Sequence, residues 1–214
     1  MANIPQVAYI IIDDPRERRE LAGILMPMKV VAMTFENVSA YFAHARNDAA
    51  ACVIVDWCPP EMGEYALQRR LLEADTPPVI FISDRGDINS VVRVMKAGAV
   101  EFLEKPVSPD SLITAVSAAL ELDRSNRQQR ANIKNLQTRL SILSPREREV
   151  FPLVVAGFPN KHTAFILGIT EVTLQIHRRQ IMRKMAARSF AELVRMASQL
   201  NIPIAKMHAR SENR

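Results

Sequence analysis

The sequence predicts an α/β fold, a doubly wound sheet of five parallel strands, followed by a small all-α domain with a helix-turn-helix. Short apolar runs rich in β-branched residues alternate with helical stretches over residues 1–122, which is the βαβ order of such sheets. From residue 123 onward the pattern is helical and basic, and a glycine turn separates two short helices within it.

Five runs are predicted to be strands: residues 7–12, 30–33, 51–55, 79–82 and 100–103. The first, third and fourth runs are apolar, which is typical of parallel strands covered on both faces. Helices are expected between the strands, over residues 16–26 and 64–74 among others.

The chain has 214 residues, of which 48% are hydrophobic and 24% charged, enough for one large or two modest domains. No apolar run approaches the roughly 20 residues that span a bilayer, and the first residues lack the features of a signal peptide. We therefore expect a cytoplasmic protein with no membrane contact. Cys52 and Cys58 have no His or Cys nearby to complete a metal site, which argues against zinc or a structural disulfide.

The charge is divided unevenly along the chain, although its net value is +5. Acidic residues outnumber basic ones in residues 1–124, and the reverse holds in residues 125–214. A basic C-terminal part indicates a polyanion as partner. The alternative is an ordinary solvated basic surface.

Polar side chains follow four of the predicted strands: Asp13 and Asp14, Asp56, Ser83, and Lys105. Because the carboxyl ends of parallel strands meet at one edge of a sheet, these groups are expected to converge there. Clustered carboxylates suit Mg²⁺, and beside that ion Asp56 could attack a phosphoryl group and form an aspartyl phosphate. Lys105 and Ser83 would then bind phosphoryl oxygens.

Each of these residues also has a structural interpretation. Asp13 and Asp14 stand before Pro15 and could cap the first helix, and Asp56 could be a loop or cap residue. Ser83 could begin a turn, and Lys105 alone could be a surface lysine. Their combination at successive strand ends favours a site.

Residues 1 to about 122 resemble the receiver domain of two-component response regulators. The stretches 83–87 (SDRGD) and 96–106 (KAGAVEFLEKP) are especially similar to the FixJ branch. The resemblance implies that Asp56 accepts phosphate from a histidine kinase and that Asp13, Asp14 and the backbone carbonyl of Cys58 help bind Mg²⁺.

The same resemblance implies that Ser83 and Phe102 are the switch pair and that Lys105 contacts the phosphoryl group, with a cis bond before Pro106. Counting back from Arg18 and Leu21 places the first acid of the family at Ile12 and the second at Asp13, so only one of the expected pair is secure unless the strand shifts by one residue. A degenerate receiver that acts without phosphorylation is the alternative.

A helical linker is predicted over residues 123–142, because the polar run that begins at Asp123 has little to bury. It separates a receiver over residues 1–122 from a DNA-binding domain over residues 143–214. An apolar seam in and just after the linker could pair with another chain or pack on its own domain, and its short length favours local packing. The seam consists of Ile133, Leu136, Leu140 and Leu143.

The last part predicts three helices. Ser144 begins the first with Glu147 in capping-box position, and Gly157 ends it. Residues 161–167 and 171–185 form the second and third, joined by a tight turn at Gly168, an arrangement whose second helix can enter the major groove. On the last helix Val172, Ile176, Ile181 and Met185 are predicted to face the core.

Residues 143 to about 202 resemble a LuxR-type DNA-binding domain, through Asn160-Lys161, Thr173, His177-Arg178 and Lys184-Met185. The resemblance implies DNA contacts by Lys161, Thr173, Gln175, Arg178 and Lys184. Phe165 and Leu174 are expected to pack, and His177 has no companion ligands for a metal.

The two resemblances together imply a transcription regulator and not an enzyme. Phosphorylation of Asp56 is expected to rearrange Ser83 and Phe102 and to make the face of residues 88–96 and the fifth strand competent for homodimerisation, which raises affinity for double-stranded promoter DNA. RNA polymerase is a further expected partner, with activation as the outcome. A phosphatase is the rival from another class, but it normally carries a second acid at the place of Cys58.

Overall fold

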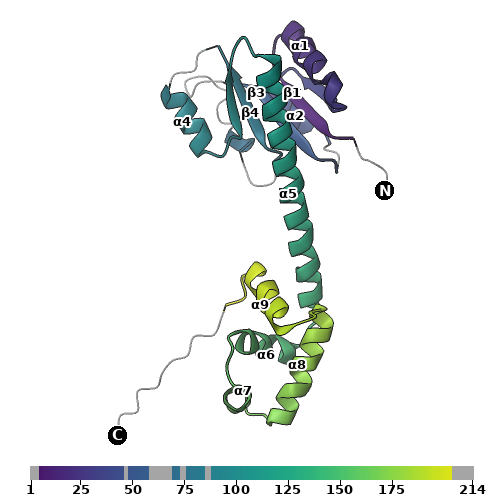
Figure 1. Ribbon diagram of the computed structural model, residues 1–214, viewed down its shortest axis with the longest axis vertical. Helices are drawn as coiled ribbons and strands as arrows, with labels where there is room; N and C mark the ends of the chain where they lie inside the picture. The colour runs from purple at the N-terminus through teal and green to yellow at the C-terminus, as the bar shows by residue number, and fades with distance from the viewer. Residues whose placement is uncertain (1–4, 46–47, 58–68, 73–75, 85–87, 204–214) are drawn as a thin grey trace. The chain divides into compact units, whose positions relative to one another are not determined.

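The computed structural model describes residues 5–45, 48–57, 69–72, 76–84 and 88–203. The chain divides into two compact units, Met1–Gln128 and Gln129–Arg214 (Figure 1). Helix α5 (Pro109–Ser141) is continuous across that division. The first unit therefore includes the start of the predicted linker, and each unit has a hydrophobic core of its own.

The first unit is built on a parallel sheet with the strand order β2-β1-β3-β4-β5. The strands are β1 (Val7–Ile11), β2 (Val31–Phe35), β3 (Ala51–Asp56), β4 (Val79–Ser83) and β5 (Glu101–Glu104). This confirms the predicted doubly wound fold, with strand ends shifted by one or two residues. The order reverses between β1 and β3, which is where such sheets open a crevice at their carboxyl edge.

Helices cover both faces of the sheet. On one face lie α1 (Pro15–Leu25), followed by the 3-10 turn η1 (Met26–Met28), and the first part of α5. On the other face lie α2 (Val38–Ala43) and α4 (Ile88–Lys96). The helix predicted over residues 64–74 lies mostly outside the described residues.

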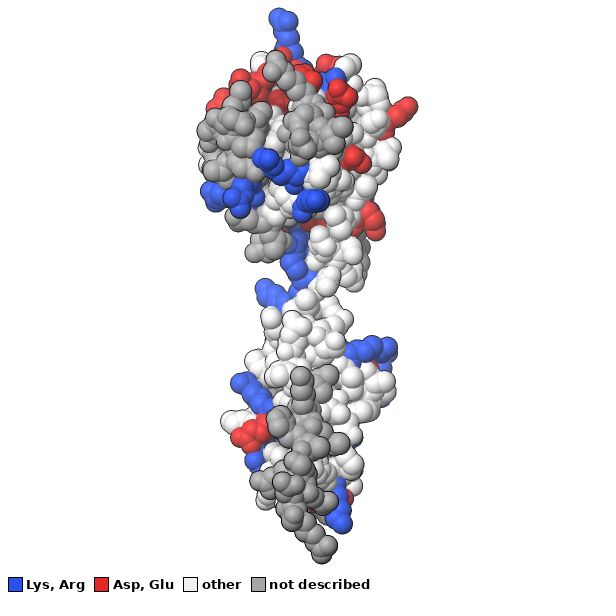
Figure 2. All heavy atoms as spheres, turned by 90° about the vertical axis from the view of Figure 1, so that its left-hand side faces the viewer, with Lys and Arg blue, Asp and Glu red and all other residues white. Residues whose placement is uncertain are grey.

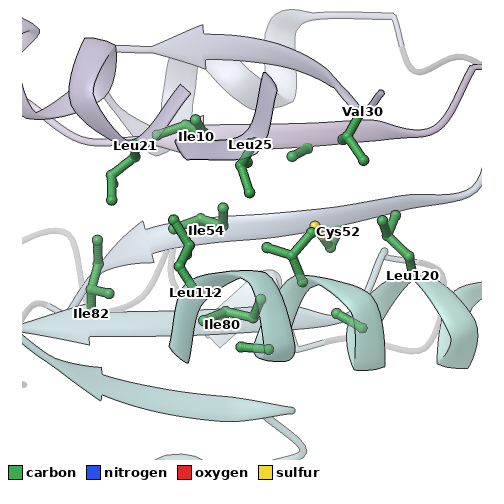
Figure 3. Packing of buried hydrophobic residues seen from close by; sticks show 14 of the residues in the cluster. Ile10, Leu21, Leu25, Val30, Cys52, Ile54, Ile80, Ile82, Leu112 and Leu120 are labelled. Carbon is green, nitrogen blue, oxygen red and sulfur yellow. The ribbon is translucent and has the colours of Figure 1, made fainter. Parts of the chain in front are cut away.

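Alternation along the strands divides the buried side chains between two cores. Ile10 faces the core under α1 and α5, where Figure 3 shows it beside Leu21 and Leu25. Its neighbour Tyr9 faces the other core, because successive side chains of a strand point to opposite faces. Burial on both faces is the reason that β1, β3 and β4 are unbroken apolar runs in the sequence.

Asp123 fixes α5 to the start of β3. Its carboxylate accepts a hydrogen bond from the Ala51 N–H at 2.8 Å and one from Arg127 Nε at 2.7 Å, and Arg127 also pairs with Asp48 at 2.8 Å. Asp123 is only 1% exposed. The prediction that the polar run has little to bury is therefore wrong at its first residue, because a carboxylate with enough donors is stable inside a protein.

Beyond α5, the described residues of the second unit form helices joined by short turns. Its helices are α6 (Pro145–Val155), α7 (Asn160–Leu167), α8 (Glu171–Met185) and α9 (Phe190–Gln199). The capping box between Ser144 and Glu147 is confirmed. Gly168 ends α7 with a φ of 64°, a left-handed conformation that glycine adopts without steric cost. Among the described residues, no helix is long and apolar enough to cross a membrane.

The apolar seam of α5 packs within its own unit. Leu136 and Leu143 are buried in the C-terminal core, and Leu140 packs against it. The Arg139 guanidinium also donates to the Met185 carbonyl at 2.9 Å, at the end of α8. This confirms local packing as the role of these three leucines.

Replacing Asp123 with alanine is expected to lower the free energy of unfolding of the receiver unit by about 2–4 kcal/mol, because it leaves the buried Ala51 N–H without its acceptor and removes one of the two carboxylates that Arg127 binds. Urea denaturation followed by Trp57 fluorescence measures this, since Trp57 is the only tryptophan. Glu121→Ala on the same helix is the control: its side chain is 73% exposed, and its loss is expected to cost less than about 1 kcal/mol. Equal effects of the two changes would contradict the role given to Asp123.

Candidate functional site

Asp56 is the last residue of β3, beside the point where the strand order reverses. It lies opposite Ile82 in the pairing with β4, while Val55 pairs with Ile11 of β1. The Trp57 N–H donates to the Ile82 carbonyl at 2.7 Å and fixes the backbone just beyond the carboxylate. The buried strand thus places a half-buried acid at the carboxyl edge of the sheet.

Lys105 lies between two carboxylates at this edge. Its Nζ is 2.6 Å from Asp56 Oδ1 and 2.8 Å from the carboxylate of Glu17, on the first turn of α1. The side chain of Lys105 is 16% exposed and that of Asp56 is 35% exposed. Glu17 was not among the predicted site residues; its signal in the sequence is an acid in the first helical turn after β1, where that turn meets the carboxyl edge of the sheet.

Burial and charge act in opposite directions on these groups. Burial raises the pKa of Asp56, and the Lys105 ammonium only partly offsets it, while Glu17 and Asp84 add to the rise. Burial tends to lower the pKa of Lys105, but the Asp56 and Glu17 carboxylates raise it above its ordinary value. Lys105 is therefore charged at neutral pH.

The two acids after β1 have different environments. Asp14 Oδ1 accepts a hydrogen bond from the Arg16 N–H at 2.8 Å, so Asp14 caps α1, the alternative that the sequence left open. Asp13 is exposed, and the Arg18 guanidinium donates to its carbonyl at 2.8 Å and to the carbonyl of Ile12. Ile12 is 1% exposed and belongs to the core.

Asp13 and Asp56 stand at the ends of the neighbouring strands β1 and β3, and their carboxylates are oxygen ligands of the kind that Mg²⁺ prefers. That ion takes one or two carboxylates and completes its shell with waters and phosphate oxygens. Among the described residues, no three or more His, Cys, Asp or Glu are grouped so as to hold a metal. Cys58, the predicted carbonyl ligand, lies outside the described residues.

Ser83 and Phe102 lie on the two neighbouring strands. Ser83 ends β4 and is 8% exposed, and its carbonyl accepts a hydrogen bond from the Lys105 N–H at 2.9 Å. Phe102 is half-buried in β5 and packs against the core beneath α4. The bond between Lys105 and Pro106 is cis, as predicted. The structure therefore brings Ser83 and Lys105 to the same edge as Asp56.

In the second unit, two of the predicted DNA contacts are bound to protein groups. Arg178 donates to Asn160 Oδ1 at 3.0 Å, and its guanidinium lies 5.4 Å from the centre of the Phe190 ring. Lys184 Nζ lies 2.6 Å from Glu147 Oε2. These contacts tie α8 to α7, α9 and α6, so both side chains stabilise the domain in this structure.

The other three predicted contacts are differently placed. Thr173 is half-buried on the first turn of α8, and its hydroxyl lies 2.9 Å from the Thr170 hydroxyl that caps the helix. Lys161 on α7 and Gln175 on α8 are exposed. Lys161 and Gln175 are therefore open to a ligand.

Two apolar residues of α8 do not face the core. Val172 is 71% exposed and Ile176 is 55% exposed, so their predicted core positions are wrong. Phe165 on α7 is 84% exposed, which overturns its predicted packing, whereas Leu174 is fully buried as predicted. The buried residues of α8 are Leu174, Ile181 and Met185.

Five of the exposed side chains of α8 lie along one face of the helix, which we call the α8 stripe. The stripe consists of Val172, Gln175, Ile176, Arg179 and Arg183. Spacings of three and four residues place these side chains above one another on an α-helix. Figure 2 shows further Lys and Arg side chains over the surface of the C-terminal unit. The stripe offers hydrogen-bond donors, cations and methyl groups on the second helix of a helix-turn-helix.

Two family models match the two units. The response regulator receiver domain matches residues 9–117, and the luxR family of bacterial regulatory proteins matches residues 141–197. The chain is 36% identical to nodulation protein W of Bradyrhizobium diazoefficiens over 94% of this chain and 89% of that protein. It belongs to the two-component response regulators with a LuxR-type DNA-binding domain. These response regulators are transcription factors and not enzymes.

Other relatives are similar in sequence along nearly the whole length of this response regulator. The response regulator protein TodT of Pseudomonas putida is 36% identical over 94% of this chain and 88% of its own. FixJ of Rhizobium meliloti is 35% identical over 88% of this chain and 93% of its own. Among solved structures, the response regulator StyR matches with a TM-score of 0.75 at 35% identity, over 91% of this chain and 99% of that one.

The ion pair between Glu147 and Lys184 makes the stability of the C-terminal unit depend on pH. Burial would raise the pKa of Glu147, but Lys184 and the Ser144 N–H lower it below its ordinary value. A carboxyl with a lowered pKa in the folded state stabilises the fold above the pKa of the unfolded chain, about 4.3, and this stabilisation is lost as pH falls through the folded pKa.

Glu147→Gln is expected to lower the free energy of opening of α6 and α8 by about 1–3 kcal/mol at pH 7, because it removes the charge that pairs with Lys184. The deficit should shrink as pH falls below about 4.3. Amide hydrogen exchange of the two helices measures it. Glu149→Gln, at a carboxylate whose side chain is 56% exposed, is the matched control; a pH-independent deficit in Glu147→Gln would contradict the charge as the cause.

Proposed function

We propose that this response regulator is a transcription factor controlled by phosphorylation of Asp56 by a histidine kinase. The observation that supports it is the position of Asp56 at the sheet reversal with Lys105 Nζ at 2.6 Å. An Asp56 oxygen attacks the phosphorus of a phosphohistidine, and the P–N bond breaks with its electron pair going to the imidazole nitrogen. Lys105 then binds a phosphoryl oxygen. Asp13 and Asp56, with the predicted Cys58 carbonyl, would hold Mg²⁺, which would supply positive charge beside the phosphoryl oxygens.

The phosphoryl group adds charge and strong acceptors beside Ser83. We assign Ser83 as the residue that moves toward the phosphoryl group and donates a hydrogen bond to it. Phe102 is the aromatic residue that moves together with Ser83. The surface of α4 and β5 is the proposed dimer face, and Val92 and Met95 give α4 exposed apolar area, at 45% and 39%. Dimerisation presents two copies of α8 to adjacent half-sites of promoter DNA.

The α8 stripe is the proposed base-reading surface. Gln and Arg side chains hydrogen-bond to base edges, and apolar side chains contact thymine methyl groups. Gln175 and Arg179 supply the first kind of contact, and Val172 and Ile176 the second. Lys161 and Thr173 remain proposed phosphate contacts, whereas Arg178 and Lys184 are assigned to holding α8 in place because protein groups already bind them.

The receiver extends over residues 1–122 in this proposal and the DNA-binding domain over residues 143–214. A histidine kinase, promoter DNA and RNA polymerase are the partners, the cytoplasm is the location, and activation of transcription is the outcome. A second candidate is a regulator that binds DNA without phosphorylation. Ile12 favours it, because a core isoleucine stands where the family has an acid.

Phosphorylation is expected to convert the wild type from monomer to dimer, and Asp56→Asn to stay monomeric, because the variant lacks the attacking oxygen. Light scattering on the full chain, with Mg²⁺ and a small acyl phosphate, gives the masses. Asp110→Asn, an exposed carboxylate at the start of α5, is the matched control and should dimerise. If all three proteins have the same mass with and without the phosphodonor, the second candidate is correct.

Arg179→Ala is expected to weaken binding of the phosphorylated protein to duplexes selected from random sequence by about tenfold, because it removes a base or phosphate contact. Fluorescence anisotropy measures the affinity at fixed salt. Arg195→Ala on α9, an exposed arginine outside the stripe, should leave it unchanged. A comparable loss in both variants would indicate general charge and not the α8 stripe.

A further inference from the structure

Glu17 is an acid that the proposed phosphorylation chemistry does not require. It stands on the first turn of α1, and its carboxylate binds Lys105 Nζ at 2.8 Å, while Asp56 binds the same ammonium at 2.6 Å. The Glu17 side chain is 24% exposed and that of Lys105 is 16% exposed. One cation is therefore shared by two carboxylates in a place with little water to screen them.

The sharing has opposite consequences for the two expected ligands of the site. A phosphoryl group on Asp56 carries further negative charge and needs the Lys105 ammonium, so the Glu17 carboxylate repels the group and competes with it for that ammonium. A divalent cation is instead attracted by every carboxylate nearby. Asp13 and Asp56 are the only carboxylates of the predicted Mg²⁺ set left to it among the described residues, because Asp14 caps α1 and Ile12 is in the core.

We propose that Glu17 is a positioning residue that acts through Lys105: it opposes phosphorylation of Asp56 and at the same time favours Mg²⁺. This inference rests on the proposed phosphorylation of Asp56. Glu17 adjusts the electrostatics of the site and takes no part in the phosphoryl transfer itself. Glu17 sets how much phosphodonor signal the receiver needs before it changes state.

The experiment compares full-length wild type, Glu17→Gln and Glu20→Gln. Glu20 lies three residues after Glu17 on the same helix and is exposed, so it is the matched control. Trp57 is the only tryptophan of the sequence and follows Asp56 directly, so its fluorescence reports Mg²⁺ alone without any phosphodonor. Electrophoresis that separates phosphorylated protein gives the concentration of a small acyl phosphate needed for half occupancy at saturating Mg²⁺.

In Glu17→Gln the dissociation constant for Mg²⁺ is expected to rise about threefold. The phosphodonor concentration for half occupancy is expected to fall by about the same factor. Both effects follow because the variant removes one negative charge that solvent only partly screens. Glu17→Ala should shift both quantities in the same directions, and Glu20→Gln neither. A structural defect or the loss of a metal ligand would weaken both Mg²⁺ binding and phosphorylation.

Two results would overturn the inference. One is a Glu17→Gln variant that loses both Mg²⁺ affinity and phosphorylation, and the other is a variant that behaves as Glu20→Gln does. In both cases the proposed function survives if wild type is still phosphorylated at Asp56. A wild type that takes no phosphoryl group at Asp56 overturns the proposed function, and the inference fails with it.

Discussion

The ion pair between Lys105 and Asp56 is the contact around which the receiver is arranged. Two charges can be held this close with limited water because the sheet fixes the backbone on either side: β3 is buried on both faces, and β5 is paired with β4. β3 delivers Asp56 at the reversal of strand order, and the chain leaving β5 delivers Lys105. The two cores on either side of the sheet, one under α1 and α5 and one under α2 and α4, keep both positions in register.

The C-terminal unit uses charge in a related way but for stability. Glu147 closes the capping box of α6 and at the same time binds Lys184 from α8, so one carboxylate satisfies a helix end and fixes a second helix. Arg178 joins α8 to α7 and α9 through Asn160 and Phe190. Basic residues of α8 thus serve two purposes: some anchor the helix, and others remain on the exposed stripe.

The sequence predicted the sheet, the helix-turn-helix and the capping box because each leaves a local pattern of apolar runs, glycine or capping residues. It failed where the outcome depends on partners distant in sequence. Val172 and Ile176 fit a helical repeat, but the repeat alone does not say which of two apolar faces is buried, and Leu174 belongs to the face that is. Asp123 and Glu17 looked like surface acids because Ala51 and Lys105, their partners, are 72 and 88 residues away.

The division of α8 into a buried face and an exposed stripe separates stability from recognition within a single helix. Leu174, Ile181 and Met185 are buried in the core, whereas Val172, Gln175 and Ile176 are exposed. If the stripe reads base edges as proposed, substitutions in it change the DNA sequence that is read with little effect on folding. Duplicated copies of such a regulator can acquire separate sets of target genes through a few changes in one helix, while the receiver and the rest of the domain stay the same.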